Sequence, residues 1–375
     1  MCVVTRLRDR PVVTTLLPVG SGRRAAVAAL VRRVAPVGGA APGTTGKRRA
    51  KRPEPVVEEE RQLRRVWARH DPQMLDVYLV SGFQDPRINV QSILGRHTLV
   101  RALFGSAYDD LMQAELAWAV ELNEAIRVRA RELGVSLVAT MDPERQAGVQ
   151  RVMREFDHRA STYAQRWREA LSGRRAPRLR VLELACGSAN DYRAMADYGL
   201  ARFLDYTGID LNAKNIDNAR RRFPDVDFRV GSILELPLPD RSVDYVVAFD
   251  IFEHLSLSAM QVALDEAVRV ARRGLYVAFF RMADVPEHVE EPRGQYHYNL
   301  LSACRIRQYL DRHYPSVEVT HISGLLQTRF GYKHSYNSRA YSLVAERPQS
   351  ARALAARLLA PLRSRIGGIV QARRT

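Results

Sequence analysis

The sequence predicts an α/β fold: a seven-stranded, mostly parallel sheet with helices on both faces, preceded by an all-helical segment. Seven strand-like runs follow one another from "RVLELA" at residue 180 to "AYSLVAE" at residue 340, and helix-like runs separate most of them. Strands such as "VDYVVAFDI" are apolar at nearly every position, which is typical of a parallel sheet covered on both faces. From about Val56 to Leu171 the apolar residues keep a helical period instead.

Charge divides the chain into a neutral body and two basic ends. The formal net charge of the protein is +17. Residues 1–53 hold 12 Lys and Arg residues and one acid, and residues 350–375 hold six Arg residues and no acid. The body between them therefore has no net charge and no bulk field that would attract a phosphate backbone. Nucleic acid is not the expected partner.

Four segments are expected along the chain. Residues 1–53, rich in Arg, Gly, Pro, Ala and Thr, are predicted to be a disordered basic extension, and a targeting peptide is the alternative. Residues 54–150 form a helical lead-in, with one helix in "YDDLMQAELAWAVELNEAIRVRARELG" and another that begins at Asp142. Residues 151–348 contain the strands. We expect the lead-in to cap a ligand site or to form the face of a homodimer.

Residues 349–375 are predicted to be a basic amphipathic tail. Apolar side chains recur in it at four-residue steps, with Arg between them, at Leu354, Leu358, Leu362 and Ile366. Such a helix can make peripheral contact with an anionic membrane surface. Because Pro361 interrupts the pattern, a helix packed on the body or a frayed tail is the alternative.

The cysteines and the lack of long apolar runs indicate a cytoplasmic protein. Cys2, Cys186 and Cys304 lie far apart, and no Cys or His spacing predicts a metal site. No run reaches the 18 or so apolar residues that a membrane helix needs.

The turn after the first strand, "ELACGSAND", has the position of a cofactor loop. In a doubly wound sheet, ligands bind at the carboxyl ends of the strands beside the first strand-to-helix turn. Gly187 is the one glycine in this turn, and Ala185 and Ala189 stand where comparable loops carry glycine. Glu183, inside the first strand, needs hydrogen-bond donors such as loop amides or a cofactor ammonium.

Acids and small polar residues follow the next strands at matching places. Asp210 ends the second strand, 23 residues after Gly187, where an acid accepts hydrogen bonds from a ribose diol. Ser232 follows the third strand and can read an adenine edge, between Leu211 and Ile233 on the two faces of the ring. Asp250 ends the fourth strand. Without a GxxxxGK[ST] motif, a ribose-and-adenine cofactor that carries a cation fits better than a pyrophosphate.

Residues 155–347 resemble the class I S-adenosylmethionine-dependent methyltransferases, which have a Rossmann-like sheet. The "EH" pair at Glu253 and His254 resembles their type 11-like small-molecule branch. The resemblance implies methyltransferase activity with S-adenosylmethionine as cofactor. The residues expected to bind this cofactor are Tyr163, Glu183, Ala185, Cys186, Gly187, Asp210, Leu211, Ser232, Ile233 and Asp250.

The resemblance also implies a role for each part of the site. In this family the first loop wraps the methionine part, the acid after the second strand binds ribose, and the pair after the third strand contacts adenine. An aromatic residue before the first strand covers the cofactor, and Tyr163 matches it. The sequence departs from the family at Ala185 and Ala189, where glycine is usual, and at Ser232, where Asp is common.

Three histidines are candidates for a general base, which methyl transfer needs only if the acceptor atom carries a proton. His297, in "EEPRGQYHYNLL" after the fifth strand, is preferred because this is the acceptor side in the family. His254 and His334 are the other candidates, and His254 can instead cap a helix or line the cofactor pocket.

The sequence therefore predicts methyl transfer to a small-molecule or glycan-like acceptor. Two alternatives stay open. One is a non-catalytic cofactor-binding or scaffold protein of the same fold, favoured by the two alanines in the loop. The other is an RNA or protein methyltransferase that its basic tails recruit to the substrate.

Overall fold

The structure of the protein is a computed structural model that describes residues 52–67, 85–137, 142–294, 296–334 and 337–347. The extension predicted for residues 1–53 lies outside the described residues except for its last two. The tail predicted for residues 349–375 lies outside them entirely.

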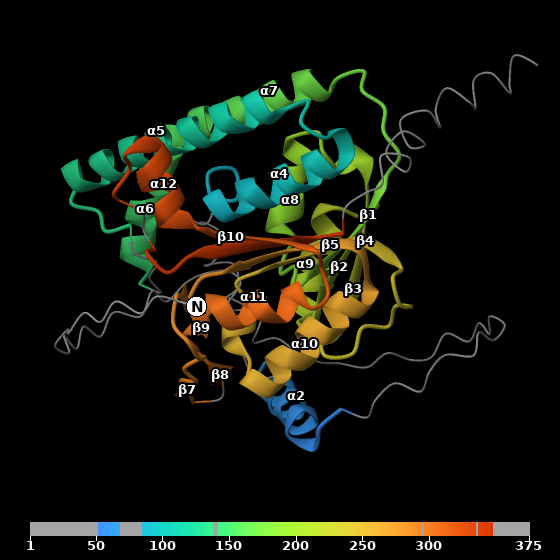
Figure 1. The fold of residues 1–375 in the computed structure, drawn as a ribbon. Helices are drawn as coiled ribbons and strands as arrows, with labels where there is room; N and C mark the ends of the chain where they lie inside the picture. The colour runs from blue at the N-terminus through green and yellow to red at the C-terminus, as the bar shows by residue number, and fades with distance from the viewer. Residues whose placement is uncertain (1–51, 68–84, 138–141, 295, 335–336, 348–375) are drawn as a thin grey trace, which may run out of the picture.

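Seven strands form one sheet in the order β10-β11-β5-β4-β1-β2-β3. β11 is antiparallel to both of its neighbours, and the other neighbouring pairs are parallel. The predicted fold class, a seven-stranded and mostly parallel α/β sheet, is confirmed (Figure 1). The strands are β1 (Leu179–Leu184), β2 (Leu204–Asp210), β3 (Asp227–Val230), β4 (Val243–Phe249), β5 (Ala271–Phe279), β10 (Ser316–His321) and β11 (Tyr341–Glu346).

The central strands are buried along their length because helices cover both faces of the sheet. All seven residues of β4 are buried, and one residue of β5 is exposed. The strand order reverses at β1, which has β2 on one side and β4 on the other. This reversal is the switch point at which open α/β sheets bind their ligands.

One face of the sheet carries most of the lead-in. Buried side chains of the strands pack there against helices on both sides of β1 in the sequence. In Figure 1 the lead-in helices α4 and α5, and α7 after them, lie above the sheet. The helices of this layer are α4 (Val90–Phe104), α5 (Asp109–Glu132), α6 (Pro143–Ala160), α7 (Thr162–Leu171), α8 (Asn190–Asp197) and α9 (Ala213–Arg222).

The other face carries α10 (Leu257–Val270), α11 (Ala303–Asp311) and the first described helix, α2 (Glu54–Trp67). Val56 and Leu63 of α2 belong to the core on this face. The lead-in therefore contributes to the cores on both faces of the sheet. No helix in the described part of the chain is long and apolar enough to cross a membrane.

Two details of the helices bear on the sequence predictions. Asp142 caps α6 by accepting a hydrogen bond from the Glu144 amide, as predicted. α6 then continues across residue 150, so the lead-in and the strand-containing part share a helix at the expected boundary. The helix α12 (Ile322–Phe330), between β10 and β11, was not predicted, and it packs on α4 and α5.

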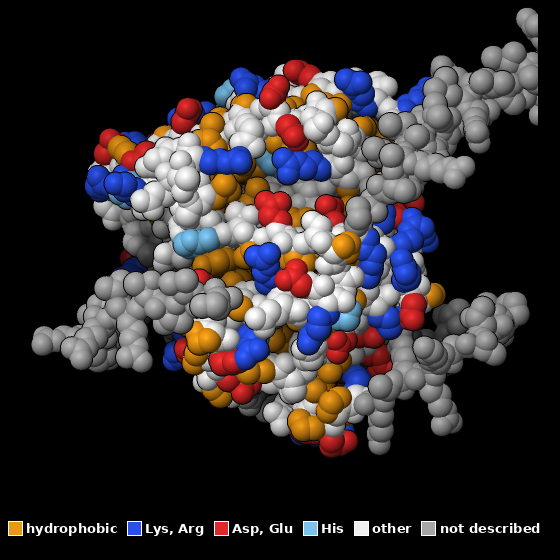
Figure 2. Space-filling view, in the orientation of Figure 1, with side chains coloured by type: hydrophobic (Ala, Val, Ile, Leu, Met, Phe, Trp, Pro, Cys, Tyr) orange, Lys and Arg blue, Asp and Glu red, His pale blue; other side chains and the backbone are white. Residues whose placement is uncertain are grey.

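A short insertion joins β5 to α11. It contains two small ladders, in which β6 (Met282–Ala283) pairs with β9 (Leu301–Ser302) and β7 (Pro292–Arg293) pairs with β8 (Tyr296–His297). α11 begins at Ala303, because Ser302 is its N-cap and accepts from the Arg305 amide. On the face shown in Figure 2, basic and acidic side chains are interspersed, as expected for a body without net charge.

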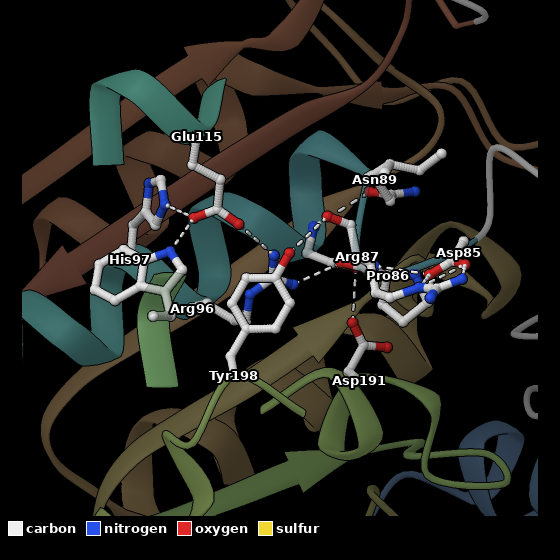
Figure 3. Close-up of polar contacts among 12 residues, drawn as sticks. Asp85, Pro86, Arg87, Asn89, Arg96, His97, Glu115, Asp191 and Tyr198 are labelled. Carbon is white, nitrogen blue, oxygen red and sulfur yellow. Dashed lines mark hydrogen bonds and ion pairs between the residues drawn. The ribbon is translucent and has the colours of Figure 1, made fainter. Parts of the chain in front are cut away.

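A buried polar network centred on Glu115 joins the helices α4, α5 and α7 (Figure 3). The Glu115 carboxylate accepts hydrogen bonds from Arg96 Nη2 at 2.9 Å, His97 Nε2 at 2.7 Å and Trp167 Nε1 at 2.7 Å. Burial alone would raise the pKa of Glu115, but Arg96 and His97 outweigh it and hold that pKa below its usual value. The network therefore contains a charged carboxylate that fastens α5 to α4 and α7.

Candidate functional site

The loop after β1 keeps a glycine-type backbone although it has one glycine. Ala185, Gly187 and Ala189 have φ values of 54°, 56° and 65°, all in the left-handed region. For a residue with a Cβ this conformation costs about 1–2 kcal/mol. The two alanines therefore adopt the left-handed backbone that glycine favours, although this conformation strains a residue with a Cβ.

The space in front of Gly187 is open. A Cβ placed on Gly187 would meet no atom within 4 Å. By contrast, a Cβ on Gly208 of β2 would lie 2.8 Å from the Cys186 sulfur. A ligand can thus approach the backbone closely at Gly187, which is the use that such loops make of glycine.

The ends of β1, β2 and β3 converge on this loop. The Gly187 amide donates to Asp210 Oδ2 at 2.9 Å, and the Gly231 amide donates to the Asp210 carbonyl at 2.9 Å. Ser232, next to Gly231, accepts a hydrogen bond from the Leu234 amide at its Oγ. The three residues that the sequence placed around one ligand, Gly187, Asp210 and Ser232, therefore follow three adjacent strand ends.

Asp210 is completely buried. Burial raises its pKa to about 7, against the opposing effect of hydrogen bonds from the amides of Asn212 and Gly187 and from the Asn215 side chain. Asn212 N and Asn215 Nδ2 donate to Oδ1 at 2.8 and 3.3 Å. The Leu211 amide acts in the same direction, so the carboxylate already has four donors.

Two further predicted residues, Glu183 in β1 and Cys186 in the loop, are buried beside Asp210 and Tyr206. The buried Glu183 carboxylate accepts a hydrogen bond of 2.7 Å from the Tyr206 hydroxyl on β2. The sequence anticipated loop amides or an ammonium as donors and did not anticipate this tyrosine. Burial, and the nearby acids Asp210 and Glu183, raise the pKa of Cys186 well above its usual value. Cys186 is therefore a neutral thiol and not a nucleophile.

The predicted apolar neighbours of the site are placed as follows. Ile233 is buried and Leu211 is half-buried. Tyr163 is buried on α7, where its ring lies 4.7 Å from that of Trp118 on α5. Arg166 Nη1 donates to the Tyr163 hydroxyl at 3.0 Å. Tyr163 thus joins α7 to the lead-in, in the same core cluster as Cys186.

Asp250, after β4, has a partner that the sequence did not reveal. Its φ is 49°, and its side chain is buried. Gln91 Nε2, from the first turn of α4, donates to Asp250 Oδ1 at 3.1 Å. The neighbouring Ser92 donates through its hydroxyl to Asp191 Oδ1 at 2.7 Å. The sequence signal for these contacts is the pair of polar residues that follows the N-cap Asn89 in "INVQSIL". The same pattern is equally typical of an exposed start of a helix.

Two of the candidate bases lie together and the third lies elsewhere. His254 Nδ1 contacts the His297 carbonyl at 3.2 Å. Because a carbonyl only accepts, Nδ1 carries the hydrogen and the neutral ring has its lone pair on Nε2. The buried His254 ring stacks on Tyr298 at 5.9 Å between centroids, whereas the His297 side chain is 20% exposed, 3.4 Å from Glu290. His334 is exposed beside Tyr332.

The described part of the chain contains no cluster of potential metal ligands. Among the described residues no group of three or more His, Cys, Asp or Glu side chains could hold a metal ion.

Comparison with known proteins relates the site to one family of transferases. A family profile described as "Methyltransferase domain" matches residues 181–274, which include the loop, Asp210, Ser232 and Asp250. A Mycolicibacterium smegmatis protein named "Probable S-adenosylmethionine-dependent methyltransferase" is 36% identical over 134 residues, 35% of this chain and 49% of the relative.

Two further relatives have named acceptors. A fatty-acid O-methyltransferase of Mycolicibacterium smegmatis is 35% identical over 29% of this chain and 40% of its own length. A phthiotriol/phenolphthiotriol dimycocerosates methyltransferase of Mycobacterium ulcerans is 36% identical over 32% of this chain and 41% of its own length. The chain thus spans about half the length, or less, of the curated relatives that it matches.

Proposed function

We propose that this chain, whose residues 181–274 form a class I S-adenosylmethionine-dependent methyltransferase domain, transfers a methyl group from S-adenosylmethionine to a small-molecule acceptor. The observation that carries the proposal is that Gly187, which has open space at its Cβ position, lies with Asp210 and Ser232 at three adjacent strand ends at the switch point of the sheet. The residues fit the cofactor, because an acid at the end of the second strand stands where sheets of this kind bind a ribose diol.

Each part of the cofactor has proposed partners. The backbone of Ala185, Cys186 and Gly187 faces the methionine part, Asp210 accepts from the ribose diol, and Ser232 contacts adenine. Leu211 and Ile233 are proposed to lie against the two faces of the adenine ring. The bound cofactor supplies an activated methyl group on a positively charged sulfur. The protein then has to hold the acceptor in line with it, which can lower much of the barrier.

The proposed acceptor is a small molecule with an apolar body. Support comes from the two relatives named for fatty-acid and phthiotriol-type substrates. The glycan-like acceptors expected from the sequence form the second class to be tested. A proton on the acceptor atom would require a base, and His254 is the better candidate because it is buried and its tautomer is fixed.

Two measurements test the proposal. Isothermal titration should give micromolar binding of S-adenosylmethionine and of its demethylated product, and Asp210→Ala should weaken both sharply. A metabolite and lipid extract incubated with isotopically labelled cofactor should then yield a labelled product in mass spectrometry. A protein that binds neither cofactor form would refute the methyltransferase assignment.

The alternatives predict different outcomes. A non-catalytic protein would bind the cofactor without labelling any acceptor. An RNA or protein methyltransferase recruited by its tails would lose activity when residues 1–51 and 348–375 are deleted, whereas an enzyme for small molecules should keep it. The left-handed backbone at Ala185 and Ala189 supports a loop of the cofactor-binding shape, so we favour the enzyme.

A further inference from the structure

We infer that Gln91 and Ser92, in the first turn of α4, are positioning residues that hold two acids that border the cofactor loop. The inference rests on the proposed function, because it concerns the site of the same cofactor. Both residues lie outside residues 181–274, the part that matches the methyltransferase family. The lead-in would then contribute directly to the cofactor site, in addition to covering it.

Gln91 joins the ends of three strands. Its side chain is 1% exposed. Nε2 lies 3.1 Å from Asp250 Oδ1, 3.0 Å from the Phe279 carbonyl and 3.4 Å from the Tyr341 carbonyl. Asp250 follows β4, Phe279 ends β5 and Tyr341 begins β11. These contacts hold the Gln91 amide nitrogen in place beside one oxygen of the Asp250 carboxylate.

Asp250 needs such support because its backbone is strained. A non-glycine residue with a φ of 49° costs on the order of 1–3 kcal/mol and persists only where its surroundings impose it. The amide of Asp250 donates to the Ala278 carbonyl at 2.8 Å, which fixes one side of the residue. Gln91 fixes the other side. The carboxylate is thus held immediately after β4, across the switch point from Gly187.

Ser92 acts in the same way on an acid that directly follows the loop in the chain. Its hydroxyl donates to Asp191 Oδ1 at 2.7 Å, and both side chains are buried (Figure 3). Asp191 is the second residue of α8, which begins directly after Ala189. Fixed carboxylates near a cationic ligand favour its binding most when they need no rearrangement. Two successive residues of α4 therefore set two acids that border the loop.

α4 itself cannot move away from the sheet without loss of packing. A Cβ on Gly95 would lie 2.9 Å from the Phe249 ring and 3.1 Å from the Tyr276 ring, so the helix is seated as closely as a glycine permits. The Tyr276 hydroxyl also donates to the Gln91 carbonyl at 2.6 Å. The helix thus presents Gln91 and Ser92 from a fixed position.

A double-mutant cycle with a matched control tests the inference. Gln91→Leu should raise the dissociation constant of S-adenosylmethionine about tenfold or more, as expected when a buried polar partner is lost. In an Asp250→Ala background the same change should have little further effect on affinity, because coupled residues are not additive. The control is Asn123→Leu on α5, a buried amide that donates to the Ala119 and Ile88 carbonyls. It should lower the melting temperature but leave affinity nearly unchanged.

A milder variant guards against unfolding. Ser92→Ala removes only a hydroxyl and should weaken cofactor binding several-fold. Its control, Thr98→Ala on the same helix, loses a hydroxyl that donates to the Leu94 carbonyl and should not weaken binding. If wild-type protein binds the cofactor and the Gln91 and Asp250 changes multiply independently, the inference is overturned. If wild-type protein does not bind, the proposed function fails instead.

Discussion

The Gly187 amide donates a 2.9 Å hydrogen bond to Asp210 Oδ2 and so joins the ends of β1 and β2. The carboxylate that should receive a ribose hydroxyl is thus already bound to the cofactor loop and has no exposed surface. If Asp210 binds the ribose as proposed, cofactor binding would draw the loop slightly away from Asp210, or share the carboxylate between the amide and the ligand. Either route makes the ionisation of Asp210 part of binding.

Cofactor affinity should fall in mild acid. Burial raises the Asp210 pKa to about 7, so the group takes up a proton as pH falls below that value. A ribose hydroxyl donates to the ionised form, and the dissociation constant should therefore rise about tenfold per pH unit below 7. Titration calorimetry between pH 5.5 and 8 measures this slope. Asp210→Asn should bind weakly at every pH, and a flat wild-type profile would contradict the ribose assignment.

Gly187→Ala should affect binding more than stability. Its φ of 56° makes a Cβ unfavourable by about 1–2 kcal/mol, and the methyl group would enter the space where the ligand approaches. We expect a drop of more than tenfold in cofactor affinity. Gly173→Ala is the control, since Gly173 has a φ of 68° and also has open space around its would-be Cβ, but lies before β1. Equal losses of affinity in both variants would argue against ligand contact at Gly187.

Substitution of His254 and substitution of His297 should have different effects on kcat. If the acceptor carries a proton, His254→Ala should lower kcat by about 100-fold or more, the range typical of a lost general base. His297→Ala should lower it little, because its side chain is partly exposed and its carbonyl, which contacts His254, remains. Cofactor affinity should be unchanged in both. Turnover assays with the acceptor found by isotope labelling decide between them, and the reverse ranking would restore His297 as the base.

Glu115→Ala should be among the most destabilising changes in the lead-in. It would leave the Arg96 guanidinium buried without its carboxylate, which typically costs about 3–5 kcal/mol. Denaturant unfolding measures the loss. Glu132→Ala, at an exposed ion pair with Arg129, should change the free energy of unfolding little. A small effect at Glu115 would mean that the network does not fasten the helices.

The sequence predicted the sheet well because its strands are apolar on both faces, as in β4. The same reasoning missed α12, because "ISGLLQTRF" begins with a β-branched residue and contains Gly324, so neither a strand nor a helix pattern dominates. Composition also could not show that α2 and α4 lie on opposite faces, since their core residues are equally apolar.

The site was predictable to the extent that it depends on strand ends. Gly187, Asp210 and Ser232 could be placed because each directly follows or ends a strand at the switch point. Gln91 could not, because its contact with Asp250 spans 159 positions in the chain. Nor does the sequence specify φ, so the left-handed conformations of Ala185 and Ala189 became visible only in the structure.

The position of β11 sets the timing of assembly during synthesis. β11 lies between β5 and β10, yet its residues 341–346 are made after all the other strands. Until they leave the ribosome, β10 has no neighbour to pair with and one edge of β5 is open. A nascent chain that stops short of residue 341 would thus expose a bare strand edge to aggregation.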